Sequence, residues 1–142
     1  MRKTIAFVPL LAVLLTACNH GSDVVGKWSV APDYIQAHSN MKPEGFMTGF
    51  ASTFWYDLKK DNTFQGSMSE GTYKVEGSKI TITTTKLMGT DVAKIPGNQG
   101  KTGIDMTGEF SADGKSLTLH PPSNGLLPAE LGSGIKMQKE SS

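Results

Sequence analysis

The chain has few residues that can do chemistry, and its one cysteine is the most informative of them. Cys18 follows Leu15, Thr16 and Ala17, and there is no second cysteine with which it could form a disulfide. A thiolate is a nucleophile and is open to oxidation, so a free thiol is a liability outside the reducing cytosol. We therefore expect the Cys18 sulfur to be capped.

Two short motifs have residue types that are used in acyl transfer. Ser39-Asn40-Met41-Lys42 matches Ser-x-x-Lys and Lys101-Thr102-Gly103 matches Lys-Thr-Gly, as in penicillin-binding proteins and β-lactamases. That chemistry needs a serine at a helix start, but here the first motif runs into Pro43 and the second lies in a glycine-rich stretch. Nothing between them supplies a Ser-Asp-Asn element, and no Gly-x-Ser-x-Gly elbow is present. We interpret the matches as coincidence and expect no enzyme activity.

One group of side chains could suit a soft metal ion. His38, Met41 and Met47 combine an imidazole with two thioethers, which are ligands that copper(I) accepts. The alternative is that the methionines fill a gap between a short helix and the rest of the fold. We favour packing, and expect neither a metal nor another cofactor.

The segment before Cys18 is organised like a secretory signal peptide. Arg2 and Lys3 precede an apolar run over residues 4–15, and small residues stand before the cysteine. The run has 12 residues, fewer than the roughly 20 that a helix needs to cross a bilayer. The sequence predicts an exported protein with a signal peptide over residues 1–17.

Leu15-Thr16-Ala17-Cys18 resembles the lipobox of bacterial lipoproteins. That resemblance implies cleavage before Cys18 and attachment of several acyl chains there, palmitate among them, which together anchor a protein stably to a membrane. Asn19, in place of an aspartate, resembles the signal for the outer membrane in a host that has two membranes, where the protein would face the periplasm. Residues 18–23 would then be a short tether. The alternative is an unpaired thiol at an ordinary export site.

The composition of residues 18–142 limits the classes of partner that the mature protein can bind. With 12 lysines, no arginine and 13 acids, its formal charge is −1. Nucleic-acid binding needs a basic face for phosphate contacts, so we expect no nucleic-acid partner. We expect residues 24–142 to form one domain that its apolar core holds together.

Alternating apolar residues and turn signals predict an all-β domain. The expected strands span residues 24–30, 50–59, 63–68, 71–75, 79–87, 104–110, 116–120 and 134–139. Asp61-Asn62, Gly77 and Asp113-Gly114 suit tight hairpin turns between them. Seven or eight such strands favour an antiparallel meander that is closed or nearly closed into a barrel. Pro32 and Asp33 predict one short helix over residues 32–41, after the first strand.

Gly26-Lys27-Trp28 resembles the Gly-x-Trp motif of lipocalin-type barrels. The hairpin segments 58–64, 71–82 and 110–119 follow in an order that is similar to small lipocalin-like domains of bacterial lipoproteins. The resemblance implies that Gly26 and Trp28 are structural, with Trp28 packed at the closed end of the barrel. An eight-stranded barrel is wide enough to be filled by side chains or to hold one small ligand.

We therefore expect a non-enzymatic binding or structural module of the cell envelope, which the lipid at Cys18 attaches to a membrane and which could hold a small apolar ligand. The alternative is a barrel that binds an envelope protein, for example as an inhibitor of a periplasmic or secreted enzyme. The long loops 89–103 and 121–133 are candidates for the contact. Leu126, Leu127 and Leu131 in the second loop would either plug one barrel end or contact a ligand or partner.

Overall fold

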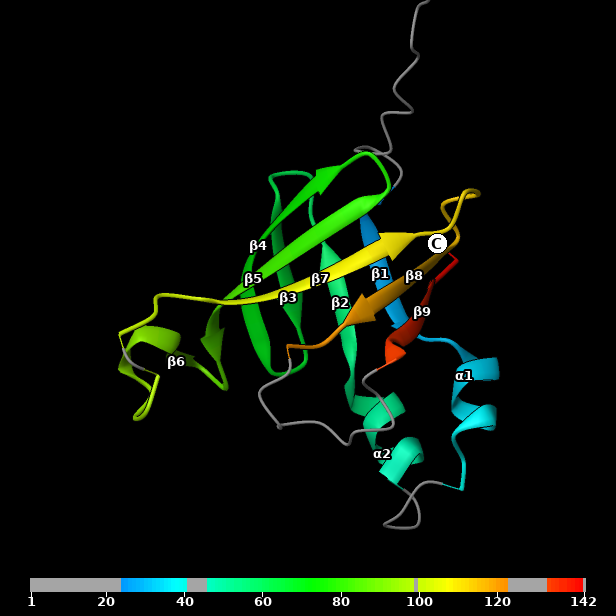
Figure 1. Ribbon diagram of the computed structural model, residues 1–142, viewed down its shortest axis with the longest axis horizontal. Coiled ribbons are helices and arrows are strands. Elements are labelled where there is room, and N and C mark those ends of the chain that lie inside the picture. Colours follow the sequence, from blue (N-terminus) through cyan, green and yellow to red (C-terminus); the bar gives the residue numbers. More distant parts are fainter. Residues whose placement is uncertain (1–23, 41–45, 99, 123–132, 142) are drawn as a thin grey trace, which may run out of the picture.

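The computed structural model describes residues 24–40, 46–98, 100–122 and 133–141, and it is dominated by one antiparallel sheet. The strands are β1 (Gly26–Val30), β2 (Trp55–Leu58), β3 (Thr63–Gly66), β4 (Ser69–Glu76), β5 (Lys79–Leu87), β6 (Thr90–Asp91), β7 (Ile104–Phe110), β8 (Ser116–His120) and β9 (Ile135–Lys139). The sheet order is β4-β3-β2-β1-β9-β8-β7-β5-β6, and β4 also pairs with β5. That last pairing closes eight strands into a barrel and leaves β6 as an extra strand on β5 (Figure 1). All strand pairings lie within residues 26–139.

Side chains alternate between the inside and the outside of the barrel, as the pleat of a β-strand requires. In β5, Ile80, Ile82 and Thr84 are buried, whereas the residues between them are more exposed. The inward residues of the barrel strands, together with helix residues such as Met47, form a single apolar core. The prediction of an all-β meander that closes into a barrel is confirmed. The predicted short helix after the first strand is also present.

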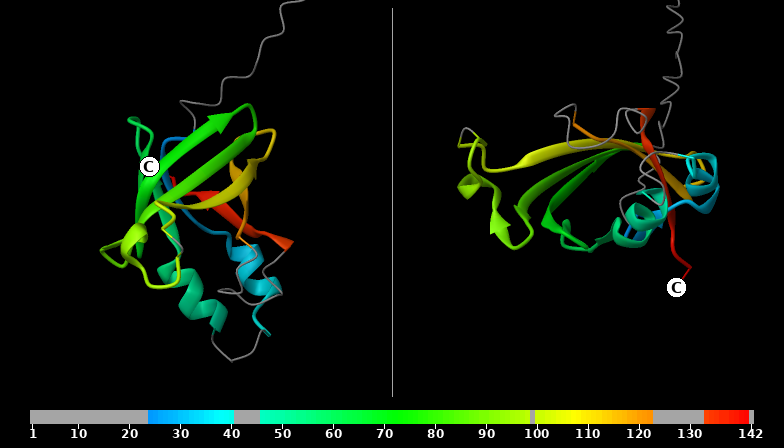
Figure 2. Two further views of the ribbon diagram at one scale, coloured as in Figure 1. Left: turned by 60° about the vertical axis from the view of Figure 1, so that its left-hand side comes forward. Right: turned by 90° about the horizontal axis from the view of Figure 1, so that it is seen from below.

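The two ends of the barrel differ in their connections. At one end β2–β3, β4–β5 and β7–β8 are joined by tight turns, in which Asn62, Gly77 and Gly114 have positive φ. At the other end lie helices α1 (Pro32–Ala37) and α2 (Phe46–Thr53) and the longer connections. The β4–β5 turn and the two helices mark these opposite ends (Figures 1 and 2). We call them the hairpin end and the open end.

The prediction of a strand over residues 50–59 is wrong in its first part. Only Trp55–Leu58 is β2, and residues 50–53 belong to α2. Phe50 and Phe54 are four residues apart, a spacing that brings side chains together on a helix as well as fitting the alternation of a strand. Their rings stack at 4.7 Å, and the backbone N–H of Phe54 donates to the carbonyl of Phe50 at 2.8 Å. The first helix also differs slightly, because α1 ends at Ala37 rather than at residue 41.

The segment 89–103 has more structure than the predicted loop. It contains β6 and a 3-10 helix, η1 (Val92–Lys94), whose Val92 is buried. The side-chain amide of Asn98 donates to the carbonyls of Val92 and Lys101, both at 2.8 Å, which stabilises the return to β7. We call the segment 89–103 the arm, and it projects to the side of the barrel away from α1 and α2 (Figures 1 and 2). Leu126, Leu127 and Leu131 of the other long loop lie outside the described residues.

Candidate functional site

The open end of the barrel contains a pocket of about 240 Å³. It lies between the start of β2, the β3–β4 hairpin, the ends of β5 and β8, and the start of β7. Its lining residues are Phe54, Trp55, Tyr56, Ser67, Met68, Ser69, Thr84, Leu87, Ile104, Met106, Pro121 and Pro122. Most of them are apolar, as is usual where a protein binds a small molecule.

A line of aromatic rings builds one wall of the pocket. The ring of Phe50 on α2 stacks on Phe54, which meets Tyr56 edge-on at 5.3 Å. Tyr56 in turn meets Phe64 edge-on at 5.3 Å in the barrel core. Such edge-to-face pairs stabilise a ring arrangement beyond the burial of its area. The wall is therefore held in place from α2 down to the core.

Three hydroxyl side chains, one phenol and the indole N–H of Trp55 are the polar side-chain groups of the residues that line the pocket. Ser67, Ser69 and Thr84 line it together with Tyr56, and the Ser67 hydroxyl donates to the carbonyl of Thr53. Burial raises the pKa of Tyr56 well above its ordinary value, while a hydrogen bond with Ser69 lowers it slightly, so the phenol is neutral at physiological pH. Among the described lining residues there is no charged side chain. The pocket is thus suited to an uncharged molecule.

Two methionines stand at the rim of the open end. Met68 in the β3–β4 turn lines the pocket, and Met88 follows β5. Both side chains are exposed, and the Met88 N–H donates to the Met68 carbonyl at 2.7 Å. The rim therefore presents apolar, polarisable side chains to solvent.

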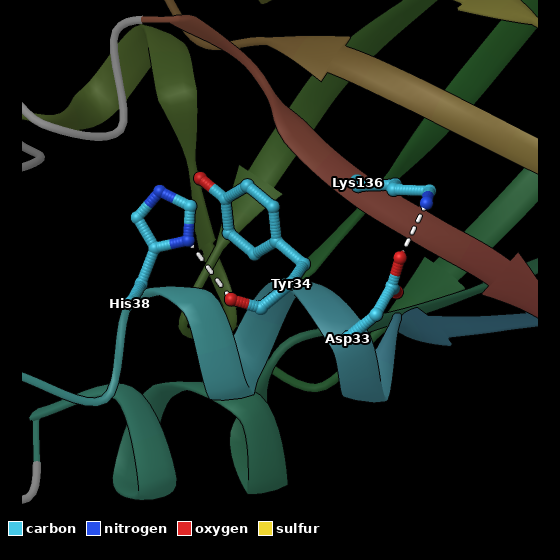
Figure 3. A network of polar contacts seen from close by, with 4 residues as sticks. All are labelled: Asp33, Tyr34, His38 and Lys136. Carbon is cyan, nitrogen blue, oxygen red and sulfur yellow. Dashed lines mark hydrogen bonds and ion pairs between the residues drawn. The ribbon is translucent and has the colours of Figure 1, made fainter.

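Helix α1 is fixed beside the same end by contacts that Figure 3 shows. The Lys136 ammonium on β9 donates to Asp33 at 2.5 Å, and this bond holds the pKa of the Asp33 carboxyl below its ordinary value. The ring of Tyr34 stacks on His38 at 4.1 Å. Burial raises the pKa of Tyr34, whose hydroxyl oxygen has no hydrogen-bond partner in the described part of the chain.

The proposed soft-metal residues occupy different settings. Met47 is part of the buried core, and the Nδ1 atom of His38 lies 2.8 Å from the carbonyl oxygen of Tyr34. Met41 lies outside the described residues. Across the described ranges, no three side chains from histidine, cysteine, aspartate and glutamate gather where they could share a metal ion.

Nothing in the described residues brings the Ser-x-x-Lys and Lys-Thr-Gly motifs together as a catalytic site. The Ser39 hydroxyl donates to the carbonyl of Gln36 just after α1, and Lys42 lies outside the described residues. Lys101 and Thr102 are in the connection before β7, on the arm that leaves the barrel.

A wider hollow of about 480 Å³ lies on the outside of the barrel, and three of its four charged side chains, Asp33, Asp113 and Lys136, are hydrogen-bonded. Asp33 is bonded to Lys136, and Asp113 accepts from Ser111 and from the backbone N–H of Lys115. These contacts fix α1 and the β7–β8 turn. The hollow therefore does not compete with the pocket as a candidate site.

Gly26 and Trp28 belong to β1 and do not line the pocket, although Trp28 pairs with Tyr56, which does. Trp28 has no exposed surface, and its indole N–H donates to the carbonyl of Val24 at 2.9 Å. Its ring lies 5.5 Å from that of Phe110. Gly26 has a φ of +130°, and a side chain there would press on Lys139. Cys18 lies outside the described residues.

The sequence pattern did not single out the pocket residues. The predicted strand over residues 104–110, which includes Ile104 and Met106 of the pocket, is confirmed as β7. Nothing in the local sequence marks which inward side chains meet empty space. In the described part of the chain, no helix has the length and hydrophobicity of a transmembrane helix.

No protein-family model, curated protein or solved structure matches this chain.

Proposed function

We propose that this chain is a lipid-anchored module of the cell envelope, of the small lipocalin-like kind, that holds a small apolar ligand at the open end of its barrel. The observation that supports this most directly is the apolar pocket of about 240 Å³ that opens between the strand ends. Its rigid aromatic wall and its few hydroxyl groups suit binding rather than catalysis, since binding sites combine an apolar lining with a few polar groups that orient the ligand.

The pocket limits the size and polarity of the ligand. Its volume lies below the roughly 300–1,000 Å³ of sites for drug-sized molecules. One or two small linked ring systems, or a short acyl chain, would fill it. A charged group placed inside would lose its hydration without gaining a charged partner among the described lining residues, which costs free energy. The ligand is therefore neutral, with at most one or two polar atoms that face Ser67, Ser69 or Thr84.

The position of the N-terminal side of the domain fits a membrane anchor. Val24 and Gly26 lead into β1 at the hairpin end, and the pocket lies at the opposite end. A lipid on Cys18, six residues before Val24, would hold the hairpin end nearer the membrane. The pocket would then open toward the aqueous phase, where a ligand can enter or leave.

A fluorescence titration tests ligand binding. The chain from Cys18 onward, with its thiol alkylated and no lipid attached, is titrated with the neutral dye N-phenyl-1-naphthylamine, which becomes fluorescent in an apolar site. We expect saturable binding that Met106→Trp abolishes, because the larger side chain fills the pocket. The control is Thr107→Trp, which places the same side chain on the outer face of the same strand. Equal binding by both variants would refute the pocket as the site.

The second candidate function is binding of an envelope protein. The observation that favours it is the arm of β6 and η1, which projects from the barrel and begins beside the exposed Met88. A photo-crosslinking amino acid at position 88 in living cells tests it. One defined protein adduct that persists in the Met106→Trp variant would favour this second function. Absence of any adduct, together with dye binding, would favour the first.

A further inference from the structure

The methionines of the described residues differ sharply in their exposure. Met68 is 50% exposed and Met88 is 77% exposed, and among the described residues these are the two large apolar side chains that are exposed. Met47 is only 2% exposed, and Met137 is not exposed at all. Met106 is intermediate. An oxidant in solution can therefore reach two sulfur atoms and is kept from at least two others.

The two exposed methionines belong to one local structure. The Met88 N–H donates to the Met68 carbonyl at 2.7 Å, which joins the β3–β4 turn to the end of β5. Met88 has a φ of +50°, a conformation that residues other than glycine seldom adopt. The neighbouring Gly89 also has a positive φ. The turn thus holds a bulky apolar side chain outward, although burial would be the usual arrangement.

We propose that Met68 and Met88 form an oxidant-responsive modification site at the mouth of the pocket. The oxidant is a peroxide. Its O–O bond breaks as one oxygen atom is transferred to the methionine sulfur, and the second oxygen leaves as water when hydrogen peroxide reacts. The sulfur loses two electrons and the peroxide gains them. The product, methionine sulfoxide, is restored to the thioether by methionine sulfoxide reductases.

Oxidation at this place would change the pocket, a consequence that rests on the proposed function. Met68 lines the pocket, so its sulfoxide would set a polar oxygen against an apolar ligand. Binding would then desolvate that oxygen without giving it a partner, which costs free energy. Met88 does not line the pocket, and its oxidation would alter mainly the rim.

The first experiment measures the modification alone, in the full chain. Cells that produce the protein are exposed to graded hydrogen peroxide, and the membrane fraction is digested and analysed by peptide mass spectrometry. We expect oxygen to be added to Met68 and Met88 at the lowest doses, with Met47 and Met137 protected as internal controls. Oxidation of Met47 or Met137 at the same dose as Met68 would overturn the site.

The second experiment measures the effect on the pocket. Residues 26–139 contain every strand pairing of the barrel, so the chain from Cys18 with an alkylated thiol retains the fold. After peroxide treatment we expect roughly tenfold weaker binding of N-phenyl-1-naphthylamine, which corresponds to about 1.4 kcal/mol. Met68→Leu should keep its affinity through the same treatment, whereas Met88→Leu should lose it as the unsubstituted protein does.

The outcomes separate this inference from the proposed function. Absence of dye binding before any oxidation would refute the proposed function and the effect on the pocket, while selective oxidation would still support the modification site. Dye binding that peroxide leaves unchanged, despite complete oxidation of Met68, would refute the effect on the pocket alone. Equal loss of affinity in the Met68→Leu variant would assign the effect to another residue and overturn the role of Met68.

Discussion

At the scale of single residues, the buried Trp28 supports the hairpin end of the barrel. It packs against Phe110, and its indole N–H satisfies the carbonyl of Val24 just before β1. Truncation would leave a cavity and an unpaired carbonyl together. The residue therefore ties the segment leading into the barrel to the core.

We expect Trp28→Ala to lower the free energy of unfolding by about 3–5 kcal/mol, the range for loss of a buried aromatic side chain. Urea denaturation followed by circular dichroism measures it. The control is Trp55→Ala, which removes the same side chain from a half-buried position, where the Lys27 ammonium lies 5.4 Å from the ring centroid. Equal losses in the two variants would contradict the structural role of Trp28.

The pKa values of the three tyrosines predict how the stability of the fold changes at alkaline pH. Burial raises the pKa of Tyr34, Tyr56 and Tyr73 above the ordinary value of 10.0, most strongly for Tyr56. The unfolded chain releases these protons at lower pH than the folded chain, so the free energy of unfolding should fall as the pH rises above about 10.

Ultraviolet absorbance of the phenolate form checks this prediction. In the folded protein we expect each tyrosine to titrate at a higher pH than it does in urea, and Tyr56 to titrate last. Titration of Tyr56 at the same pH in the folded protein as in urea, with the circular dichroism of the fold intact, would show that it is not buried as described.

At the scale of elements, the sequence predicted the strands better than the helices. The ranges 79–87, 104–110 and 116–120 agree with β5, β7 and β8 to the residue, because alternation there is regular and turns with glycine flank it. Helix α2 could not be told from a strand, since Phe50 and Phe54 satisfy both periods. The backbone hydrogen bond from the N–H of Phe54 to the carbonyl of Phe50 shows that this segment is helical.

Residue 49 tests the assignment of α2. Gly49 is exposed, and a β-carbon there would meet no other atom within 4 Å. In a helix, Gly49→Ala should raise the free energy of unfolding by about 1 kcal/mol, and Gly49→Val should give roughly half of that gain or less. In a strand the order would be reversed, because valine favours strands over alanine. Denaturation of both variants distinguishes the two assignments.

The pocket illustrates what a sequence of this kind does not specify. Its residues come from four separate strands and from the segments that flank them, and each satisfies its own local pattern. Whether the inward side chains fill a barrel depends on their summed volumes and on how the strand ends splay. At the hairpin end Trp28 and Phe110 fill the interior, whereas at the open end Met106 and Ile104 leave about 240 Å³.

At the scale of the whole molecule, the start of β1 and the pocket lie at opposite ends of the barrel, and the proposed orientation on a membrane depends on lipidation of Cys18. We expect the protein to incorporate a radiolabelled fatty acid and to fractionate with membranes. Cys18→Ser should abolish the label and leave the precursor uncleaved or misplaced. The control is Thr16→Ser, which keeps a small residue before the cysteine and should remain labelled. A mature protein without label, or one that is fully soluble, would contradict the anchor.

Methyl-group nuclear magnetic resonance tests the central claim, that the open end binds a neutral apolar molecule, most directly. The chain from Cys18, with methionine and isoleucine methyl groups labelled with carbon-13, is titrated with N-phenyl-1-naphthylamine. We predict saturable shifts of the Met68, Met106 and Ile104 signals, and unchanged signals for Met137 and Ile135 deep in the core. Absence of shifts, or shifts confined to residues outside the pocket, would contradict the account.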